Sequence, residues 1–463
     1  MGCAAGPLVG WGGYSRLSVL ALGSFWGRRR AGHALALVTV SVLATGSVLS
    51  AAPRGQVMAQ VEPAQALPDP KPAWTEPAQL QLAIAPTPSA NPRTQGADQT
   101  TANANANLIN PRLGLPRWVR TVRDTALWST SDQAASKLGE LSAQAIYLKP
   151  LGSYTDGRLD VYFPGDADTR PPMQAWIDAT AVEPSGVPPW VATPAAQKSL
   201  IGLPKAPERT GAAAPPNVSA WYVAIVDDAS GELIYGEQPN VSVPQASTTK
   251  IATTIVALER SPDLSRRIKV TVSASAMVAR DGSSTMGIEP GRSVGLDTLL
   301  YGMMLPSGND AAEQVALSLA DSREQFVAWM NDEAAALGLA DTHFANPSGM
   351  DAPGHYSSAY DMAMLARYAM RNPTFRQLVS TVRFNGDSYP MRNLNRLLDV
   401  YPGADGVKIG YTDLAQKTIV ASAVHDGHRV YVSLMHSADL VSDSIALFDW
   451  VWANYEWPGQ SAE

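Results

Sequence analysis

The segment Ala246-Ser247-Thr248-Thr249-Lys250-Ile251 decides how the second half of this chain is interpreted. An apolar run follows it, which predicts a helix that begins at this segment. Ser247 and Lys250 are three residues apart, so helical spacing brings their side chains together on one face. A neighbouring base can activate a serine hydroxyl, and a lysine can be that base once its pKa is lowered. Alone the pattern is weak, because a helix-capping serine beside a solvated lysine has the same spacing.

A second segment, Pro306-Ser307-Gly308-Asn309, lies between two helical patterns. Its proline and glycine predict a turn, from which the Ser307 hydroxyl and the Asn309 carboxamide would project. The hydroxyl can relay a proton, and the carboxamide can hold a substrate amide. The alternative is a turn that only caps the helix predicted over residues 310–319.

A third segment, Gly406-Val407-Lys408-Ile409-Gly410-Tyr411-Thr412, precedes two strand-like runs, residues 418–424 and 429–435. An Asp-Gly pair joins these runs, which predicts a hairpin. On an adjoining edge strand, Lys408 would lie beside a backbone that a substrate strand can pair with. The alternative is an edge lysine that discourages aggregation.

Ser-x-x-Lys, Ser-x-Asn and Lys-x-Gly in this order are the pattern of penicillin-recognising serine enzymes. The flanking segments 246–251, 306–312, 342–350 and 355–359 resemble the D-alanyl-D-alanine carboxypeptidase family, the low-molecular-mass penicillin-binding proteins. The resemblance covers about residues 218–455. It implies a β-lactamase/penicillin-binding-protein-like transpeptidase fold of the α/β (α+β) class, with an antiparallel sheet and a helical subdomain.

The resemblance also implies a mechanism. Ser247 is the implied nucleophile, which forms an acyl-enzyme while removing the terminal D-alanine from peptidoglycan stem peptides. Lys250 is the implied general base, Ser307 a proton relay, and Asn309 the group that orients the acyl portion. The implied substrate-binding residues are Lys408, Ile409, Gly410, Tyr411 and Thr412, with the backbone N–H groups of Ser247 and Tyr411 at the oxyanion. β-Lactams would be covalent ligands, and no metal or other cofactor is needed.

Two positions depart from the family pattern. Ile409 stands where a threonine usually gives the substrate carboxylate a hydrogen bond, a loss of ~1–3 kcal/mol if nothing replaces it. Thr412 or a water molecule is the candidate replacement. Gln416 stands where a glycine is usual, and the sequence offers no functional reason. The alternatives are therefore a D,D-endopeptidase, a β-lactamase-like hydrolase, or a catalytically weakened peptidoglycan-binding protein.

The N-terminal part of the chain differs in composition. Residues 1–60 hold five arginines and no acid, and an uncharged stretch over 31–52 follows Arg28-Arg29-Arg30. This pattern predicts export, through either a cleaved signal peptide or an uncleaved membrane anchor. We therefore expect the protein at the outer face of the cytoplasmic membrane or in the cell wall. Residues 60–116 are rich in proline and alanine and predict a flexible linker.

Short strand-like runs between residues 117 and 183 predict a small all-β barrel. The stretch resembles bacterial Src-homology-3-like domains, which often bind cell-wall material in exported enzymes. We expect Trp118, Trp128 and Trp176 to form the barrel core, with ligand contact as the alternative. The expected division of the chain is 1–59 signal or anchor, 60–116 linker, 117–183 barrel, 184–217 linker, 218–456 carboxypeptidase domain, and 457–463 tail.

Composition limits the remaining function classes. The chain has 463 residues, a formal net charge of −7 and one cysteine, Cys3. The acidic balance argues against non-specific nucleic-acid binding, which needs a basic surface. A single cysteine excludes an intramolecular disulfide and any metal site built from several cysteines.

Overall fold

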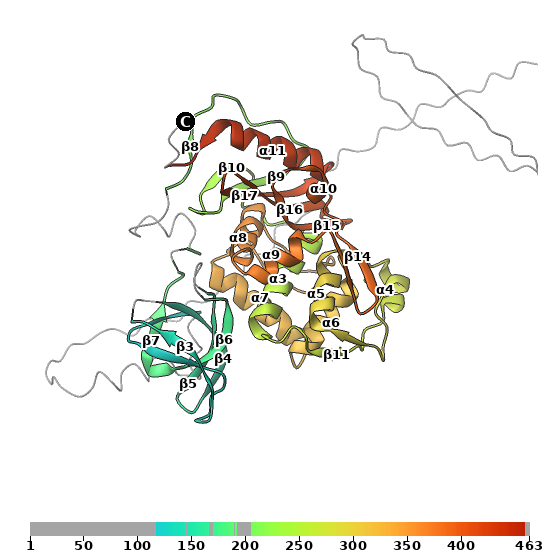
Figure 1. The fold of residues 1–463 in the computed structure, drawn as a ribbon. Coiled ribbons are helices and arrows are strands. Elements are labelled where there is room, and N and C mark those ends of the chain that lie inside the picture. The colour runs from blue at the N-terminus through green and yellow to red at the C-terminus, as the bar shows by residue number, and fades with distance from the viewer. Residues whose placement is uncertain (1–116, 144–145, 166–169, 189, 192–204, 459–463) are drawn as a thin grey trace, which may run out of the picture. The chain divides into compact units, whose positions relative to one another are not determined.

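The computed structural model describes residues 117–143, 146–165, 170–188, 190–191 and 205–458 (Figure 1). All of them belong to one compact unit of the chain, residues 92–463. The predicted signal or anchor, the first linker and much of the second linker lie outside the described residues. No helix within the described ranges is long and apolar enough to cross a bilayer.

Seven antiparallel strands form the N-terminal sheet, β1 to β7. They are β1 (Trp118–Thr121), β2 (Thr125–Trp128), β3 (Lys137–Leu141), β4 (Tyr147–Thr155), β5 (Arg158–Phe163), β6 (Met173–Asp178) and β7 (Val182–Ser185). Their order is β3-β2-β6-β5-β4-β1-β7. The predicted all-β character is confirmed, but β3 and β7 are the two ends of the pairing order, so these pairings do not close a barrel. The resemblance to Src-homology-3-like domains stays a prediction.

The expected tryptophan core of this sheet is wrong, because in each strand the aliphatic neighbour of the tryptophan, and not the tryptophan, belongs to the apolar cluster inside the sheet. The apolar cluster inside the sheet contains Val119, Leu127 and Ile177. Alternate strand residues face opposite sides, so Trp128 and Trp176 lie on the other face, where they are cross-strand partners. Trp118 is buried, but in the large apolar cluster that also contains helices α3 and α7.

A five-stranded antiparallel sheet organises the C-terminal part. Its strands are β9 (Tyr222–Asp227), β10 (Leu233–Glu237), β15 (Ala404–Thr412), β16 (Gln416–His425) and β17 (His428–Ser437), in the order β10-β9-β17-β16-β15. Both predicted hairpins, β9–β10 and β16–β17, are confirmed. β15 is an edge strand, as its sequence predicts. The antiparallel sheet and helical subdomain implied by the resemblance are therefore present.

Helices cover both faces of this sheet. The helices of the C-terminal part are α3 (Lys250–Arg260), α4 (Ala274–Asp281), α5 (Leu296–Met304), α6 (Asn309–Leu319), α7 (Arg323–Leu337), α8 (Ala359–Ala369), α9 (Pro373–Ser380), α10 (Leu397–Val400) and α11 (Leu440–Asn454). α11 packs on one face, against odd-numbered residues of β9 such as Val223 and Ile225. The even-numbered residues Ala224 and Val226 face the opposite cluster, which contains α3 and α8. Because successive side chains of β9 point to opposite faces of the sheet, one set packs against α11 and the other faces the cluster with α3 and α8.

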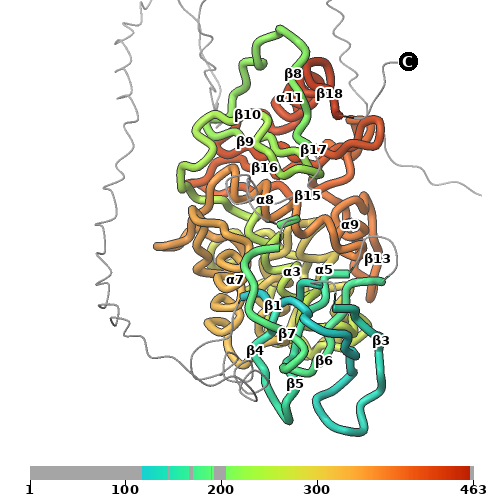
Figure 2. The backbone as a smooth tube through the Cα atoms, turned by 90° about the vertical axis from the view of Figure 1, so that its left-hand side faces the viewer, coloured from blue at the N-terminus to red at the C-terminus, as the bar shows by residue number. Residues whose placement is uncertain are grey.

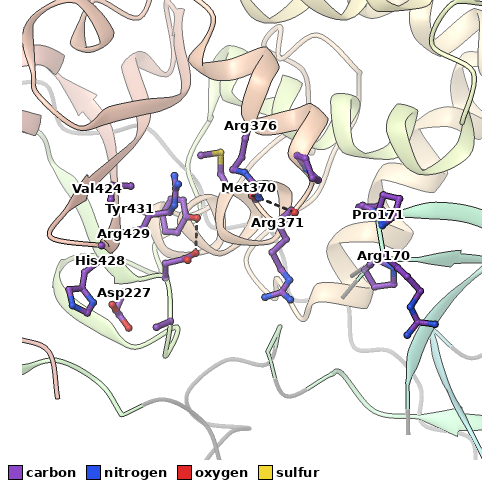
Figure 3. A pocket seen from close by; sticks show the side chains of 17 residues that line it. Arg170, Pro171, Asp227, Met370, Arg371, Arg376, Val424, His428, Arg429 and Tyr431 are labelled. Atoms are coloured by element: carbon purple, nitrogen blue, oxygen red, sulfur yellow. Dashed lines mark hydrogen bonds between the residues drawn. The ribbon is translucent and has the colours of Figure 1, made fainter. Parts of the chain in front are cut away.

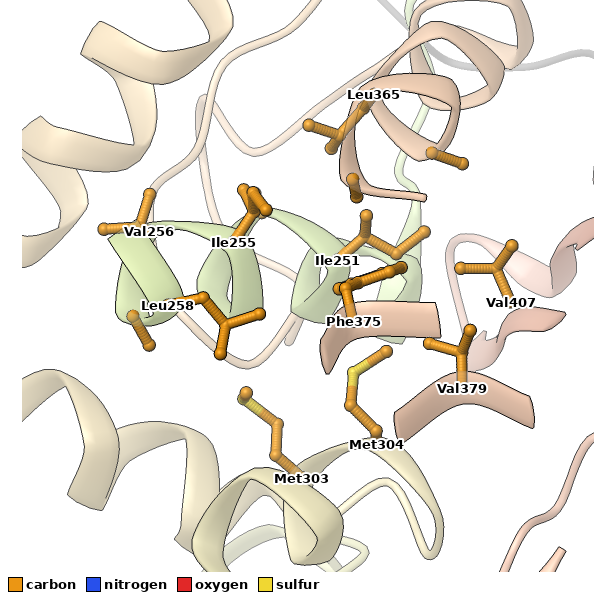
Figure 4. Close-up of a cluster of buried hydrophobic side chains, with 14 of the residues drawn as sticks. Ile251, Ile255, Val256, Leu258, Met303, Met304, Leu365, Phe375, Val379 and Val407 are labelled. Atoms are coloured by element: carbon orange, nitrogen blue, oxygen red, sulfur yellow. The ribbon is translucent and has the colours of Figure 1, made fainter. Parts of the chain in front are cut away.

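The core around α3 holds the catalytic candidates in place. Ile251 and Ile255 of α3 lie among Met304 of α5, Phe375 of α9 and Val407 of β15 (Figure 4). Because α3 is buried on nearly all sides, its first residue is fixed relative to β15.

Short strand pairs complete the architecture: β8 (Glu208–Arg209) with β18 (Tyr455–Glu456), β11 (Arg267–Lys269) with β12 (Ser293–Gly295), and β13 (Arg383–Gly386) with β14 (Tyr389–Arg392). Figure 2 shows β8 and β18 side by side, although they lie far apart in the sequence. The pairing joins the beginning and the end of the C-terminal part.

Candidate active site

Ser247 and Lys250 lie at the start of the buried helix α3. Ser247 belongs to a single 3-10 turn, Ala246–Thr249, and Lys250 is the first residue of α3. Lys250 Nζ lies 2.8 Å from Ser247 Oγ. The three-residue spacing therefore brings the hydroxyl and the amine together, as the sequence predicts.

The environment of Lys250 favours a neutral amine. The side chain is fully buried, and its burial lowers the pKa of Lys250 well below the usual value. The nearby Lys408 lowers that pKa further, since a second cation disfavours the charged form. The three hydrogen-bond partners of Lys250 Nζ are Ser247 Oγ, Asn309 Oδ1 and the carbonyl oxygen of Ser348, none of which carries a charge.

The second predicted segment joins this cluster from the loop between α5 and α6. Asn309 opens α6, and its Oδ1 lies 2.7 Å from Lys250 Nζ. Its Nδ2 donates to Ser283 Oγ at 3.2 Å, which fixes the orientation of the carboxamide. Ser307 is buried on the same loop in a left-handed conformation, with φ of 63°. Such a conformation is strained for a serine and is found mainly at functional sites.

The segment Asn346–Gly349 is a part of the site whose role the sequence did not reveal. The Ser348 carbonyl accepts a hydrogen bond from Lys250. Asn346 Oδ1 accepts backbone N–H groups of Ser348, Gly349 and Met350, which shapes the loop. Gly349 has φ of 90°, and a Cβ there would collide with the Ala246 carbonyl. The sequence signal for this segment is the family resemblance of residues 342–350, which does not indicate its contact with Lys250.

The edge strand β15 passes directly beside Ser247. A Cβ on Gly410 would lie 2.7 Å from the Ser247 backbone nitrogen and 2.6 Å from Thr418 Oγ1. No side chain fits there, so the glycine is explained by the close approach of β15 to Ser247.

Lys408 lies on β15, on the same side of the strand as Gly410. Its side chain is buried, and Nζ donates to the Ile409 carbonyl at 2.8 Å. Burial lowers the pKa of Lys408 to about 7. The Lys408 amine is therefore only partly protonated at neutral pH.

The remaining predicted binding residues divide between three environments. Ile409 packs against the apolar cluster beneath α11. Tyr411 is exposed, and its hydroxyl donates to Asp413 Oδ1 at 3.2 Å. Thr412 Oγ1 donates to Asp351 Oδ1 at 2.7 Å. The Thr412 hydroxyl thus ties β15 to the 346–351 loop.

The histidine nearest this cluster is His355, a buried residue. Its Nδ1 accepts the Ala345 N–H at 2.9 Å, which leaves the proton on Nε2, 2.8 Å from Thr249 Oγ1. Burial lowers the pKa of His355 to about 4, so the ring is neutral. A neutral histidine held in this way supports the start of α3.

A separate cavity of about 610 Å³ lies away from these residues (Figure 3). Arg371 and Arg376 line it beside Asp227, Arg429 and Tyr431. Tyr431 donates its hydroxyl to Asp228 at 2.7 Å. None of the predicted site residues lines this cavity, so it is not the catalytic cleft.

Comparisons with known proteins identify similar chains. A family model described as D-alanyl-D-alanine carboxypeptidase matches residues 209–438. D-alanyl-D-alanine carboxypeptidase DacB2 of Mycobacterium tuberculosis is 35% identical over 292 residues, which span 60% of this chain and 89% of the relative. DacF of Bacillus subtilis is 33% identical over 51% of this chain and 63% of its own length.

Two solved structures are also similar to part of this chain. The Streptomyces K15 DD-transpeptidase is 30% identical, covers 52% of this chain and all of its own, and has a TM-score of 0.49. A D-alanyl-D-alanine carboxypeptidase structure from Mycobacterium tuberculosis H37Rv is 34% identical over 55% of this chain, with the same TM-score of 0.49. The family model and the coverage of DacB2 decide the assignment: this chain belongs to the D-alanyl-D-alanine carboxypeptidase family.

Proposed function

We propose that the protein is a serine-type carboxypeptidase that removes the terminal D-alanine from peptidoglycan stem peptides through an acyl-enzyme on Ser247. One observation carries this proposal. A fully buried lysine amine lies 2.8 Å from the Ser247 hydroxyl, and all its partners are uncharged. This arrangement makes the amine a base and the hydroxyl a nucleophile.

The hydrogen bonds of Lys250 support its role as the base. A neutral amine has two protons and one lone pair. Asn309 Oδ1 and the Ser348 carbonyl can only accept, so they take the two protons. The lone pair then faces the Ser247 hydroxyl and accepts its proton as Oγ attacks the carbonyl carbon between the two D-alanines.

The other groups have roles at the substrate. Asn309 orients the acyl portion, and Ser307 passes a proton to the departing D-alanine. The backbone N–H groups of Ser247 and Tyr411 stabilise the oxyanion, which is supported by the close approach of Gly410 to the Ser247 nitrogen. Water then attacks the acyl-enzyme and restores Ser247. β-Lactams act as covalent ligands of the same serine.

The substrate carboxylate is bound mainly by the cation of Lys408. Ile409 supplies no hydroxyl and packs beneath α11 instead. Thr412 already donates to Asp351, so it is engaged in holding the loop. We infer that Gly410 and Tyr411 contribute backbone pairing on the open edge of β15.

The site of action follows from the substrate, because peptidoglycan lies outside the cytoplasmic membrane. Residues 31–52 act as the export signal or the anchor in this proposal. The expected linkers and the domain boundaries at 117–183 and 218–456 belong to the same proposal.

The test measures free D-alanine released from a pentapeptide that ends in D-Ala-D-Ala. The full chain should release it, Ser247→Ala should not, and Ser380→Ala, an exposed serine at the end of α9, should match the wild type. Equal release by the wild type and Ser247→Ala would overturn the serine mechanism. Hydrolysis of a cross-linked dimer into its two monomers, without release of D-alanine from the pentapeptide, would identify an endopeptidase instead.

A further inference from the structure

Lys149 of β4 is a buried lysine that the proposed mechanism does not use. Its ammonium group lies 2.6 Å from Glu259 Oε1 and is also paired with Glu333 Oε2. Glu259 lies near the end of α3, and Glu333 lies in α7. Lys149, Glu259 and Glu333 are 4%, 2% and 4% exposed. One cation from the N-terminal sheet therefore sits between two buried carboxylates of the C-terminal part.

Aromatic side chains close this ion cluster off from water. The Tyr368 hydroxyl donates to Glu259 Oε1 at 2.6 Å, and Lys149 Nζ lies 4.9 Å from the Tyr368 ring centre. The ring centres of Trp118 and Tyr162, both from the N-terminal sheet, lie 5.8 Å and 5.7 Å from the same nitrogen. In such surroundings an unpaired charge is strongly unfavourable.

Hydrogen bonds to backbone carbonyls also join the N-terminal sheet to α3 and α7, on either side of the ion cluster. Trp118 Nε1 donates to the Ala336 carbonyl of α7 at 2.8 Å. In the opposite direction, Arg260 at the end of α3 donates to the Leu151 carbonyl of β4 at 2.9 Å. The contact thus has hydrogen bonds in both directions and a buried centre, unlike a loose contact between tethered domains.

Without Lys149, Glu259 and Glu333 would be two neighbouring buried carboxylates that repel each other. Burial, together with the negative charge of Glu333, raises the pKa of Glu259 to about 7, which shows how unfavourable two carboxylates are in this space. Glu333 Oε1 has no hydrogen-bond partner among the described residues. Lys149 is the group that offsets their repulsion.

We propose that α3 and α7 form a docking surface for the N-terminal sheet, and that Lys149 makes the stability of the peptidase part depend on this sheet. The sheet is then a structural partner of the catalytic helix α3, which begins with Lys250, rather than only a tethered module. This inference concerns folding stability and stands independently of the serine chemistry.

Thermal unfolding of the full chain tests the proposal. Lys149→Met keeps the apolar length and removes the charge, and it should lower Tm by roughly 10 °C. The matched control is Lys137→Met, because Lys137 is an exposed lysine of the same sheet, paired with Glu140. The control should melt within about 2 °C of the wild type.

A rescue variant separates charge compensation from a general packing defect. Lys149→Met/Glu259→Gln/Glu333→Gln removes all three charges and should regain most of the lost Tm. If Lys149→Met alone does not fold, recovery of a folded chain in the triple variant supports the proposal equally. Lys149→Met that melts like the Lys137→Met control, or a triple variant no more stable than Lys149→Met, overturns it.

Discussion

Lys149 and Lys250 are both almost completely buried, at 4% and 0% exposed, but the groups that surround them differ in charge. Lys149 faces two carboxylates and joins the N-terminal sheet to α3 and α7. Lys250 faces a hydroxyl, a carboxamide and a carbonyl. A buried amine with anionic partners is a structural ion, whereas one with neutral partners is suited to exchange a proton. The partners, and not the burial, separate the two roles.

The largest effect is expected when Lys250 is given an anionic partner, because this removes the difference between the two lysines. Asn309→Asp places a carboxylate at 2.7 Å from Nζ in the present geometry, which should raise the pKa of Lys250. The protonated fraction of Lys250 at neutral pH then increases, and acylation by a fluorescent penicillin should slow by about 10- to 1,000-fold. The rate should recover as the pH rises. A slow rate with an unchanged pH profile would contradict this account of Lys250.

The next largest effect on acylation is expected at Gly410, which packs closely against Ser247, in comparison with Gly139, which lies in an open part of the N-terminal sheet. Gly410→Ala puts a methyl group 2.7 Å from the Ser247 nitrogen, so β15 or the 3-10 turn must shift. We expect acylation to slow by about 100-fold, since small displacements of a nucleophile have effects of this size. Gly139→Ala is the control in the N-terminal sheet, where a Cβ meets nothing within 4 Å. Equal rates in the two variants would show that the close approach is unimportant.

A smaller effect separates Lys408 from the other buried lysines. Its pKa of about 7 means that the cation is present below this pH and is lost as the pH rises through it. The kcat/KM for a peptide with a free carboxylate should therefore fall about tenfold between pH 7 and 9. Lys408→Arg stays charged throughout, so its profile should lack this decline. The same decline in Lys408→Arg would assign it to another group.

The smallest effect is expected at Gln416, at the turn between β15 and β16. Its φ of 54° lies in the left-handed region, which explains why glycine is usual there. Gln416→Gly should raise the free energy of unfolding by about 1 kcal/mol, measured by denaturant titration. Gln377→Gly, inside α9, should lower it by a similar amount. Destabilisation by Gln416→Gly would show that the side chain outweighs the strain.

Much of the fold could be predicted because its signals are local. The Asp426-Gly427 pair predicts the β16–β17 hairpin, and both residues have the positive φ values that such a turn requires. The helix predicted over residues 310–319 is α6, which begins one residue earlier and ends at the predicted residue.

The tryptophan error shows where local signals fail. Trp118-Val119, Leu127-Trp128 and Trp176-Ile177 are apolar pairs, so alternation alone does not say which member faces inward. The large rings were favoured for the core, but the smaller aliphatic neighbours fill it. Trp118 is instead buried against α7, a surface that the sequence of the N-terminal sheet does not reveal.

The site could be predicted in part for the same reason. Ser247 and Lys250 meet through helical spacing, which is readable in the sequence. The partners of Lys149 are 110 and 184 residues away, and no local pattern links them. The Ser348 carbonyl is a backbone atom, so residue type gives no indication of its contact with Lys250.

The contact between Lys250 and the Ser348 carbonyl affects which amino-acid substitutions this site can tolerate during evolution. Every amino acid carries the same oxygen, so no single substitution at position 348 deletes the acceptor that Lys250 uses. Selection at this point acts on the path of the chain, through Asn346 and Gly349, which shape the loop. A substitution of Ser348 therefore leaves this contact of the Lys250 amine in place. The contacts with Ser247 and Asn309 use side-chain atoms, so substitutions there can remove them.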